Sequence, residues 1–305
     1  MNSIFETPVY PIPPFFSAAG YLDNAKIQNY VAYLVQGGAK AFMTTVGTSG
    51  YNLLELGEIQ AFNYQVHATL GNEYPLIVGL PIGSVTLIEK FLDNLKLTNI
   101  NNRYFMAVYP DRYYDDDGIT AYFQELSKVC SPLFIHGLHI RKGVGGGYHD
   151  YNGSLMKNIL DNCPKVIGMK EECSGLEKVV DLFSGINSSR SDFESILAGG
   201  SQRRFLFGKA FGATNFLAGL GSFKPYLDNS FFDNIHETGD NRYDSLTEFI
   251  EKEDTLFQFT SKHGWHPCMR EGICSLLNTE YYPRSPFPAL DSKTALELYN
   301  LVSDI

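Results

Sequence analysis

The residues with the clearest chemical potential lie in the segment KVIGMKEECSG, residues 165–175. The segment reads as a short apolar strand that carries one lysine, Lys170, to its C-terminal end, with acidic and small residues directly after it. Strand interiors favour β-branched and aromatic residues, so a lysine there either reaches solvent or has a use. A neutral ε-amine condenses with a carbonyl substrate to form a Schiff base. Lys170 is therefore a candidate nucleophile, and the alternative is a lysine that snorkels to solvent at a strand end.

Schiff-base chemistry requires an unusual environment for the amine. At the ordinary pKa near 10.4, only about one lysine in 2,500 is neutral at pH 7, whereas a pKa near 7.5 leaves roughly a quarter neutral. Burial in an apolar site lowers the pKa of a lysine, because it disfavours the charged form. If Lys170 is a nucleophile, we expect it to be buried.

Two other predicted strand ends carry groups that suit an anionic substrate. The turn GTSG, residues 47–50, offers the hydroxyls of Thr48 and Ser49 together with free backbone N–H groups. His136 ends the fifth predicted strand, and Arg141 follows five residues later. Histidine transfers protons near neutral pH, and arginine binds a carboxylate through two parallel hydrogen bonds. The alternatives are an ordinary tight turn, a hydrogen-bonded core histidine and a surface arginine.

Eight short apolar runs alternate with amphipathic patterns in the first 221 residues. The predicted strands are 4–10, 41–45, 76–79, 104–108, 133–136, 166–170, 195–198 and 213–217, and the predicted helices are 24–36, 85–97, 119–129, 155–162, 175–184 and 202–211. The first helix has Asp23 as a possible N-cap. This alternation predicts a parallel sheet closed into a (β/α)8 TIM barrel, in which active-site groups gather at the C-terminal ends of the strands.

After residue 221 the strand pattern ends. Segments near 242–257, 267–277 and 292–303 have helical patterns. We therefore predict two parts, a (β/α)8 barrel over residues 1–221 and a C-terminal helical extension over residues 222–305 that packs on the barrel.

The composition limits the classes of function. A hydrophobic content of 44% and an aromatic content of 14% are typical of a globular chain. The net charge of −10 argues against nucleic acid and anionic membrane surfaces as partners. The sequence has neither an apolar run of 18 residues nor a signal-peptide pattern at its N-terminus, and its five scattered cysteines fit reduced thiols. We therefore expect a cytoplasmic protein without a membrane partner.

Two further patterns suggest a bound group but lack the residues that it would need. The glycine-rich loop 143–147 has no GKS/T signature, which argues against a nucleotide. His263, His266 and Cys268 have no second ligand pair at a plausible spacing, which argues against zinc. We expect neither a metal nor another cofactor.

Together, the GTSG turn, the arginine five residues beyond strand five and the segment GMKEECSG resemble the dihydrodipicolinate synthase and N-acetylneuraminate lyase superfamily. There the corresponding patterns are GTTGE, YNxPxRT and a strand-six lysine in a G-[IVM]-K-[ED] context. The resemblance extends from TPVYPIPPF near the start of the chain to GWHPCMREG in its helical tail. It implies a (β/α)8 barrel, a Schiff base between the lysine and a 2-oxo acid such as pyruvate, and aldol-type cleavage, condensation or dehydration. It also implies a homo-oligomer, either a dimer or a tetramer.

The resemblance also assigns roles to individual residues. Lys170 matches the Schiff-base lysine, and Thr48 and Ser49 match the hydroxyl pair that holds the pyruvyl carboxylate. Arg141 matches the arginine at the mouth of the site that binds a substrate carboxylate in the synthases.

The departures from the family pattern concern proton transfer. His136 stands where the family has a tyrosine that relays protons, and Tyr51 stands at the glutamate of GTTGE. The tyrosine that a neighbouring subunit lends to the relay belongs to the strand-four loop, VYPDRYYDDDG, where Tyr113 and Tyr114 are candidates. Imidazole can act as a general acid and base, so we expect His136 to take the role of the missing tyrosine.

These residues predict a Schiff-base lyase for a 2-oxo acid such as pyruvate or a 2-keto-3-deoxy acid. One alternative is an authentic dihydrodipicolinate synthase (4-hydroxy-tetrahydrodipicolinate synthase) with a modified proton relay. An alternative of another class is a non-catalytic relative that binds a keto acid. The missing tyrosine favours that alternative, whereas the lysine and the GTSG turn oppose it.

Overall fold

The structure is a computed structural model that describes residues 3–97, 100–110, 115–141, 148–172, 175–235 and 242–305. Eight strands form one sheet in the order β1-β2-β3-β4-β5-β8-β9-β10, and the strand pairs with a described register are parallel. These strands are β1 (Val9–Pro11), β2 (Ala41–Met43), β3 (Leu76–Gly79), β4 (Arg103–Ala107), β5 (Leu133–Gly137), β8 (Val166–Glu171), β9 (Glu194–Leu197) and β10 (Asn215–Phe216). Helices alternate with the strands, and the fold is a (β/α)8 barrel. Further helices follow the barrel in the C-terminal part of the chain, as the sequence predicts.

The helices connect successive strands and then form the C-terminal part. They are α1 (Asn24–Gln36), α2 (Leu56–Leu70), α3 (Val85–Leu95), α4 (Asp116–Val129), α5 (Gly153–Asn162), α6 (Leu176–Ser189), α7 (Ser201–Lys209), α8 (Pro225–Asn234), α9 (Arg242–His263), α10 (Trp265–Leu276) and α11 (Ser292–Asp304). Short 3-10 helices lie at η1 (Tyr51–Leu53) and η2 (Leu220–Ser222). None of the helices in the described part of the chain is long and apolar enough to cross a membrane.

The chain divides into two compact units, which we describe separately. Unit 1 comprises Met1–Glu6 and Pro75–Leu217, and unit 2 comprises Thr7–Tyr74 and Ala218–Ile305. The predicted domain boundary after residue 221 stays a prediction.

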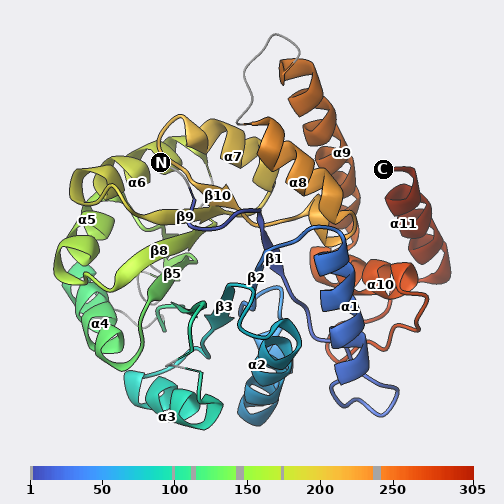
Figure 1. The fold of residues 1–305 in the computed structure, drawn as a ribbon, viewed down its shortest axis with the longest axis horizontal. Coiled ribbons are helices and arrows are strands. Elements are labelled where there is room, and N and C mark those ends of the chain that lie inside the picture. Colours follow the sequence, from blue (N-terminus) through green and yellow to red (C-terminus); the bar gives the residue numbers. More distant parts are fainter. Residues whose placement is uncertain (1–2, 98–99, 111–114, 142–147, 173–174, 236–241) are drawn as a thin grey trace. The chain divides into compact units, whose positions relative to one another are not determined.

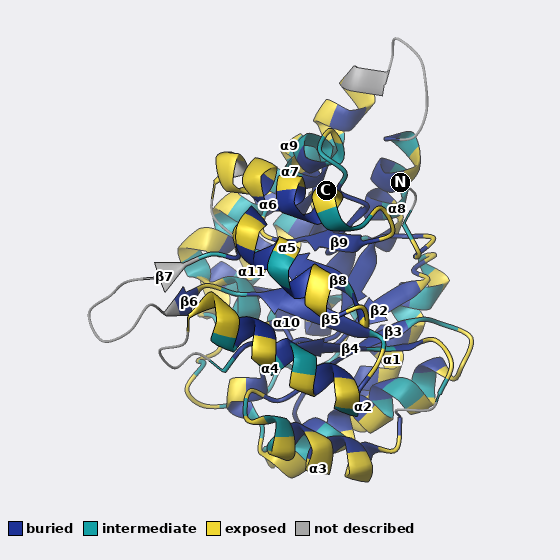
Figure 2. Ribbon diagram, turned by 90° about the vertical axis from the view of Figure 1, so that its left-hand side faces the viewer, coloured by how far each residue is buried: buried dark blue, intermediate teal, exposed yellow. Residues whose placement is uncertain are grey.

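Unit 1 contains strands β3 to β10 and helices α3 to α7. Helices α4, α5 and α6 follow one another along the outer side of β5 and β8 (Figure 1). The strands are buried, whereas helices such as α4 and α5 show exposed residues on their outward sides (Figure 2). This burial on both faces explains why the strands read as continuous apolar runs in the sequence.

Unit 2 contains β1, β2, α1, α2 and the helices after β10. The predicted N-cap of α1 is confirmed, because the Asp23 carboxylate accepts a hydrogen bond from the Lys26 backbone N–H. Helices α2 and α8 were not predicted from the sequence, although α2 has a capping box in which Glu55 and Glu58 accept from each other's backbone N–H groups.

The N-terminal strand is shorter than the sequence predicts. A strand was expected over residues 4–10, but β1 begins only at Val9, directly after Pro8, which has no N–H group for a ladder. Ser3 and Ile4 instead donate hydrogen bonds to the buried Glu194 carboxylate on β9, at 2.8 and 2.9 Å. A side-chain acceptor therefore takes the backbone N–H of Ile4, which a strand would have used.

Candidate active site

Strand β8 carries Lys170 next to its last residue, as the sequence predicts. The register of β8 pairs Lys170 with His136 of β5 and with Ile196 of β9. Lys170 is 1% exposed, and its Nζ lies 3.0 Å from His136 Nε2. The lysine is therefore buried among strands and does not snorkel to solvent.

A carboxylate that the sequence reasoning missed completes this group. Glu172 Oε1 contacts Lys170 Nζ and lies 3.4 Å from His136 Nε2. The side chain of Glu172 is 31% exposed, whereas that of Lys170 is 2% exposed. Alternate residues of an extended chain point to the same side, so the spacing between residues 170 and 172 was the signal that could have identified this carboxylate.

Glu171, between them, takes a structural part in unit 1. Its carboxylate is buried and pairs with Arg204 of α7, which also donates to the backbone carbonyl of Ala198 after β9. These contacts tie the end of β8 to β9 and to α7. Glu172, the second of the two glutamates that follow the lysine, contacts the amine.

Burial determines the protonation of the two bases. It lowers the pKa of Lys170 to about 7, with the nearby charge of Glu171 opposing this effect and that of Arg204 adding to it. Contact with the Glu172 carboxylate also opposes the lowering, because it favours the ammonium form. Burial, followed by the charge of Lys170, lowers the pKa of His136 well below its ordinary value. At neutral pH the imidazole is therefore neutral, and a large fraction of the amine can be neutral too.

The imidazole of His136 uses one nitrogen within this cluster. Its Nε2 faces Lys170 and Glu172, whereas its Nδ1 is buried and has no hydrogen-bond partner among the described residues. His136 is thus a buried histidine that is hydrogen-bonded to Lys170 through Nε2, and its ring lies where it can exchange a proton with the amine. Its part in proton transfer stays a prediction.

The turn GTSG lies in unit 2, and most of its hydrogen-bond donors are already used. The backbone N–H groups of Thr48, Ser49 and Gly50 donate to Thr45 Oγ1, to the carbonyl of Thr45 and to the carbonyl of Gly47. The expectation of several free N–H groups in this turn was therefore wrong for these three. A tight turn satisfies its own amides, and the sequence could not show this.

The two hydroxyls of the turn differ in their freedom. Ser49 Oγ is buried, donates to the carbonyl of Ile12 at 2.6 Å and accepts from the Thr45 N–H at 2.9 Å. Thr48 Oγ1 has no hydrogen-bond partner among the residues that the structure describes. Thr48 is thus the residue of the pair with a hydroxyl proton available for a ligand.

A buried cation lies behind this turn. Arg270 of α10 is 2% exposed, and its Nη2 donates to the Thr48 carbonyl at 3.1 Å. Burial lowers the pKa of Arg270, and its Nε and Nη1 have no hydrogen-bond partner within the described part of the chain. This guanidinium gives the turn a positive charge that the sequence did not reveal.

Tyr51, at the position of the family glutamate, is part of a closed set of hydrogen bonds in unit 2. The Asn63 amide donates to Tyr51 Oη at 2.8 Å, the Thr44 hydroxyl donates to Asn63 Oδ1 at 2.6 Å, and Tyr51 Oη donates to Thr44 Oγ1 at 3.3 Å. Burial raises the pKa of Tyr51 to about 12. A neutral phenol therefore stands where the family pattern has a carboxylate.

The remaining predicted site residues are less fully described. Arg141 ends β6 (Ile140–Arg141), which pairs antiparallel with β7 (Tyr148–His149), and the side chain of Arg141 lies outside the described part of the structure. Tyr113 and Tyr114 also lie outside the described residues. Their roles stay predictions.

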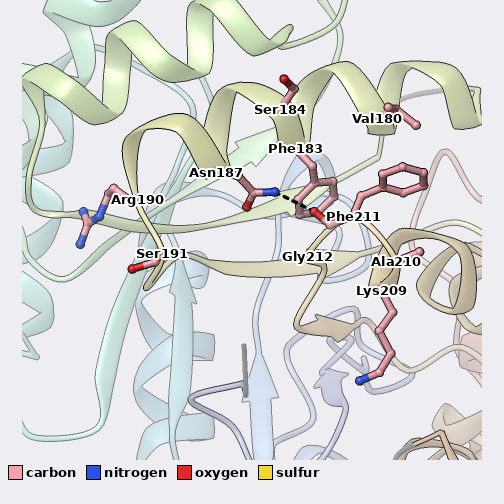
Figure 3. A pocket seen from close by; sticks show the side chains of 10 residues that line it. All are labelled: Val180, Phe183, Ser184, Asn187, Arg190, Ser191, Lys209, Ala210, Phe211 and Gly212. Carbon is pink, nitrogen blue, oxygen red and sulfur yellow. Dashed lines mark hydrogen bonds between the residues drawn. The ribbon is translucent and has the colours of Figure 1, made fainter.

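A surface groove of about 570 Å³ lies elsewhere in unit 1, along α6 and the end of α7 (Figure 3). In it the Asn187 amide donates to the Phe211 carbonyl at 2.9 Å. Arg190 at its edge is already bonded to the Asp192 carboxylate. Lys170 does not line the groove, so the groove is not part of the candidate active site.

Comparisons with known proteins show which solved structures share this fold. No protein-family model matches this sequence, and no curated protein sequence matches it. Solved structures match over nearly the whole chain at low sequence identity. YagE, a prophage protein of the dihydrodipicolinic acid synthase family from E. coli K12 in complex with pyruvate, has a TM-score of 0.80 at 14% identity, covering 98% of both chains.

Two further structures match equally broadly. N-acetylneuraminate lyase from Fusobacterium nucleatum has a TM-score of 0.82 at 12% identity, covering 98% of both chains. Dihydrodipicolinate synthase from Thermotoga maritima has a TM-score of 0.82 at 16% identity, again covering 98% of both chains. This chain therefore has the fold of the dihydrodipicolinate synthase and N-acetylneuraminate lyase structures, at a low sequence identity to both.

Proposed function

We propose that the protein is a divergent member of this superfamily, a class I lyase that forms a Schiff base with a 2-oxo acid through Lys170. One observation carries the proposal: a fully buried lysine, with its pKa lowered to about 7, lies 3.0 Å from an imidazole at the C-terminal end of a barrel strand. Active sites of (β/α)8 barrels lie at that end of the strands.

The proposed reaction uses the neutral amine as nucleophile. Lys170 Nζ attacks the keto carbon, the carbinolamine loses water, and the resulting iminium accepts electrons from a neighbouring bond as it breaks. Aldol cleavage, aldol condensation and dehydration all use this electron sink. His136, neutral and next to the amine, is the proposed acid and base for the proton transfers.

The substrate carboxylate is proposed to bind at the turn GTSG. The free hydroxyl of Thr48 and the buried charge of Arg270 behind the turn support an anionic ligand there. Ser49 stays a prediction, because its hydroxyl proton is directed at the Ile12 carbonyl and that bond would have to open. Arg141 is proposed to bind a second anionic group, at the far end of the substrate.

The complex of YagE with pyruvate supports pyruvate as the first 2-oxo acid to test. The wild-type protein, incubated with pyruvate and borohydride, should gain one reduced pyruvyl group in its intact mass, and peptide mapping should place it on Lys170. Lys170→Ala should gain none. Absence of an adduct from pyruvate and from a panel of 2-oxo acids would contradict the Schiff-base proposal, and trapping that persists in Lys170→Ala would contradict the residue assignment.

Measured turnover distinguishes the two alternatives, a non-catalytic binding protein and an authentic synthase. An adduct without turnover of any 2-oxo acid would favour a non-catalytic binding protein. Turnover that condenses pyruvate with an aldehyde would favour the synthase. A homo-oligomer and a cytoplasmic location stay predictions, as does the absence of nucleic-acid partners.

A further inference from the structure

Three ionisable side chains meet at the end of β8, and they differ in their access to solvent. Lys170 and His136 are each 1% exposed. Glu172 contacts the lysine amine and lies 3.4 Å from the imidazole Nε2, yet its side chain is 31% exposed. Glu172 therefore joins two buried bases to the solvent.

The charged groups around the cluster act in different ways. On β8, Glu171 is turned toward Arg204 of α7 and forms an ion pair with it. On β5, His136 faces the amine through Nε2. Glu171 and Arg204 influence Lys170 through their charge, whereas Glu172 contacts Nζ.

We propose that Glu172 is a catalytic acid and base of this site, which carries protons between Lys170, the reacting oxygen of the substrate and solvent. The inference rests on the proposed function and adds to it a residue that the family pattern does not contain. The family relay uses tyrosine, and the chain supplies a carboxylate at a different position.

Each proton is accounted for in the proposed steps. The Lys170 ammonium transfers a proton to the Glu172 carboxylate, which leaves a neutral amine and a carboxylic acid. The amine attacks the keto carbon, and one proton moves from its nitrogen to the former keto oxygen. Glu172 then donates its proton to this hydroxyl group, which leaves as water. The products are an iminium on Lys170, one water molecule and the regenerated carboxylate.

His136 is less suited to the solvent-linked part of this transfer. Its imidazole is buried, and burial together with the charge of Lys170 keeps it neutral. A proton that it receives must leave through a neighbour. Glu172 contacts the amine, lies close to the imidazole and reaches solvent, so a single side chain can perform both transfers.

The test is the rate of adduct formation in Glu172→Gln, which keeps the shape of the side chain and removes its basicity. We expect rapid-quench borohydride trapping with pyruvate to show adduct formation slowed by roughly 10²–10⁴-fold. The pyruvate concentration for half-saturation should change little, because the carboxylate of pyruvate binds elsewhere. Glu177→Gln is the matched control, since Glu177 is an exposed carboxylate in the first turn of α6, and it should behave as wild type.

A second variant distinguishes a catalytic role of Glu172 from a structural one. Glu172→Ala opens space beside the amine, and added formate should restore its rate in proportion to the formate concentration. A folded Glu172→Ala variant that is slow and shows no response to formate or acetate would mean that Glu172 only supports the local structure, which overturns the proposal.

The outcomes separate the two proposals. A wild-type rate of adduct formation in Glu172→Gln overturns the role of Glu172 and leaves the Schiff-base function standing. Absence of any adduct in the wild-type protein overturns both. Slow trapping in Glu172→Gln, restored by formate in Glu172→Ala, supports both.

Discussion

At the scale of single residues, protonation states decide what this site can do. Lys170 and His136 are both bases, and burial shifts both of their pKa values downward. The sequence alone suggests a pH–rate limb at the ordinary histidine pKa near 6.5. Because the pKa of His136 is lowered well below that value, the limb near neutral pH should belong to Lys170. The rate should rise with pH through about 7, since the neutral amine is the proposed nucleophile.

The variant His136→Ala distinguishes the role of His136 from that of Lys170. The variant should still form the Schiff base, because Lys170 remains, but its turnover should fall by roughly 10²–10⁴-fold, the usual range for a general acid or base. The measurement is steady-state turnover of a cleavable 2-oxo acid beside borohydride trapping, with both followed from pH 5 to 9. The limb near pH 7 should persist in the variant.

Unchanged turnover in His136→Ala would contradict its role and leave Glu172, Tyr113 and Tyr114 as the acid and base candidates. If the limb near pH 7 disappears from the pH–rate profile of His136→Ala, the histidine, and not the lysine, titrates there.

At the scale of elements, the site depends on register and close packing in unit 1. The parallel pairing of β5 with β8 aligns His136 with Lys170, and a shift by one residue would turn the two side chains to opposite faces. Helices α5 and α6 lie on the outer side of these strands (Figure 1) and approach each other at Gly153 and Gly185. The Asp181 carboxylate of α6 also accepts from the Gly153 N–H at 2.9 Å. The backbones touch there because neither glycine has a side chain.

Gly185→Ala tests this helix contact. A Cβ at residue 185 would lie 1.9 Å from the Gly153 carbonyl oxygen, so the helices must separate. Overpacking of this kind costs about 1–3 kcal/mol in free energy of unfolding. Gly57→Ala in α2 is the matched control, because a Cβ there meets no atom within 4 Å and should stabilise the protein by about 0.4–1 kcal/mol.

Urea unfolding followed by circular dichroism measures both variants. Equal stabilities of Gly185→Ala and the wild type would show that α5 and α6 can move apart without loss.

At the scale of the whole molecule, the stability of the chain should depend on pH through a buried carboxyl group. Glu194 is 2% exposed, and burial raises its pKa from 4.5 to about 7, although hydrogen bonds from Ile4, Ser3 and Thr214 partly oppose the rise. Between those two pH values the folded state binds more protons than the unfolded state. The free energy of unfolding that Glu194 contributes therefore falls as pH rises from about 4.5 to 7 and stays low above it.

Glu194→Gln should flatten this dependence. Glutamine stays neutral and keeps an oxygen acceptor for the Ile4 N–H, so the variant should lose stability less steeply than the wild type between pH 5 and 7. Above pH 7 it should be the more stable protein, by an amount on the order of 3 kcal/mol at most. Urea unfolding at pH 5, 6, 7 and 8 measures the difference. Parallel curves for the two proteins would contradict a raised pKa at Glu194.

The sequence by itself determined most of the strands and helices and the position of the candidate nucleophile, Lys170. The bounds of α1 and β3 agree with their predictions, and Lys170 lies at the strand end where the apolar run placed it. Local patterns suffice for such features, because hydrophobic period, capping and turn residues act over a few positions.

Only the tertiary structure decided the contacts of the candidate site residues. Within unit 1 it brings Glu172 and His136 to the amine, and within unit 2 it directs the Ser49 hydroxyl to Ile12 and places Arg270 behind the turn. The shifts in pKa arise from the same contacts and from burial. Residues up to 222 positions apart make these contacts, so their partners follow from the packing of strands and helices and not from any local pattern.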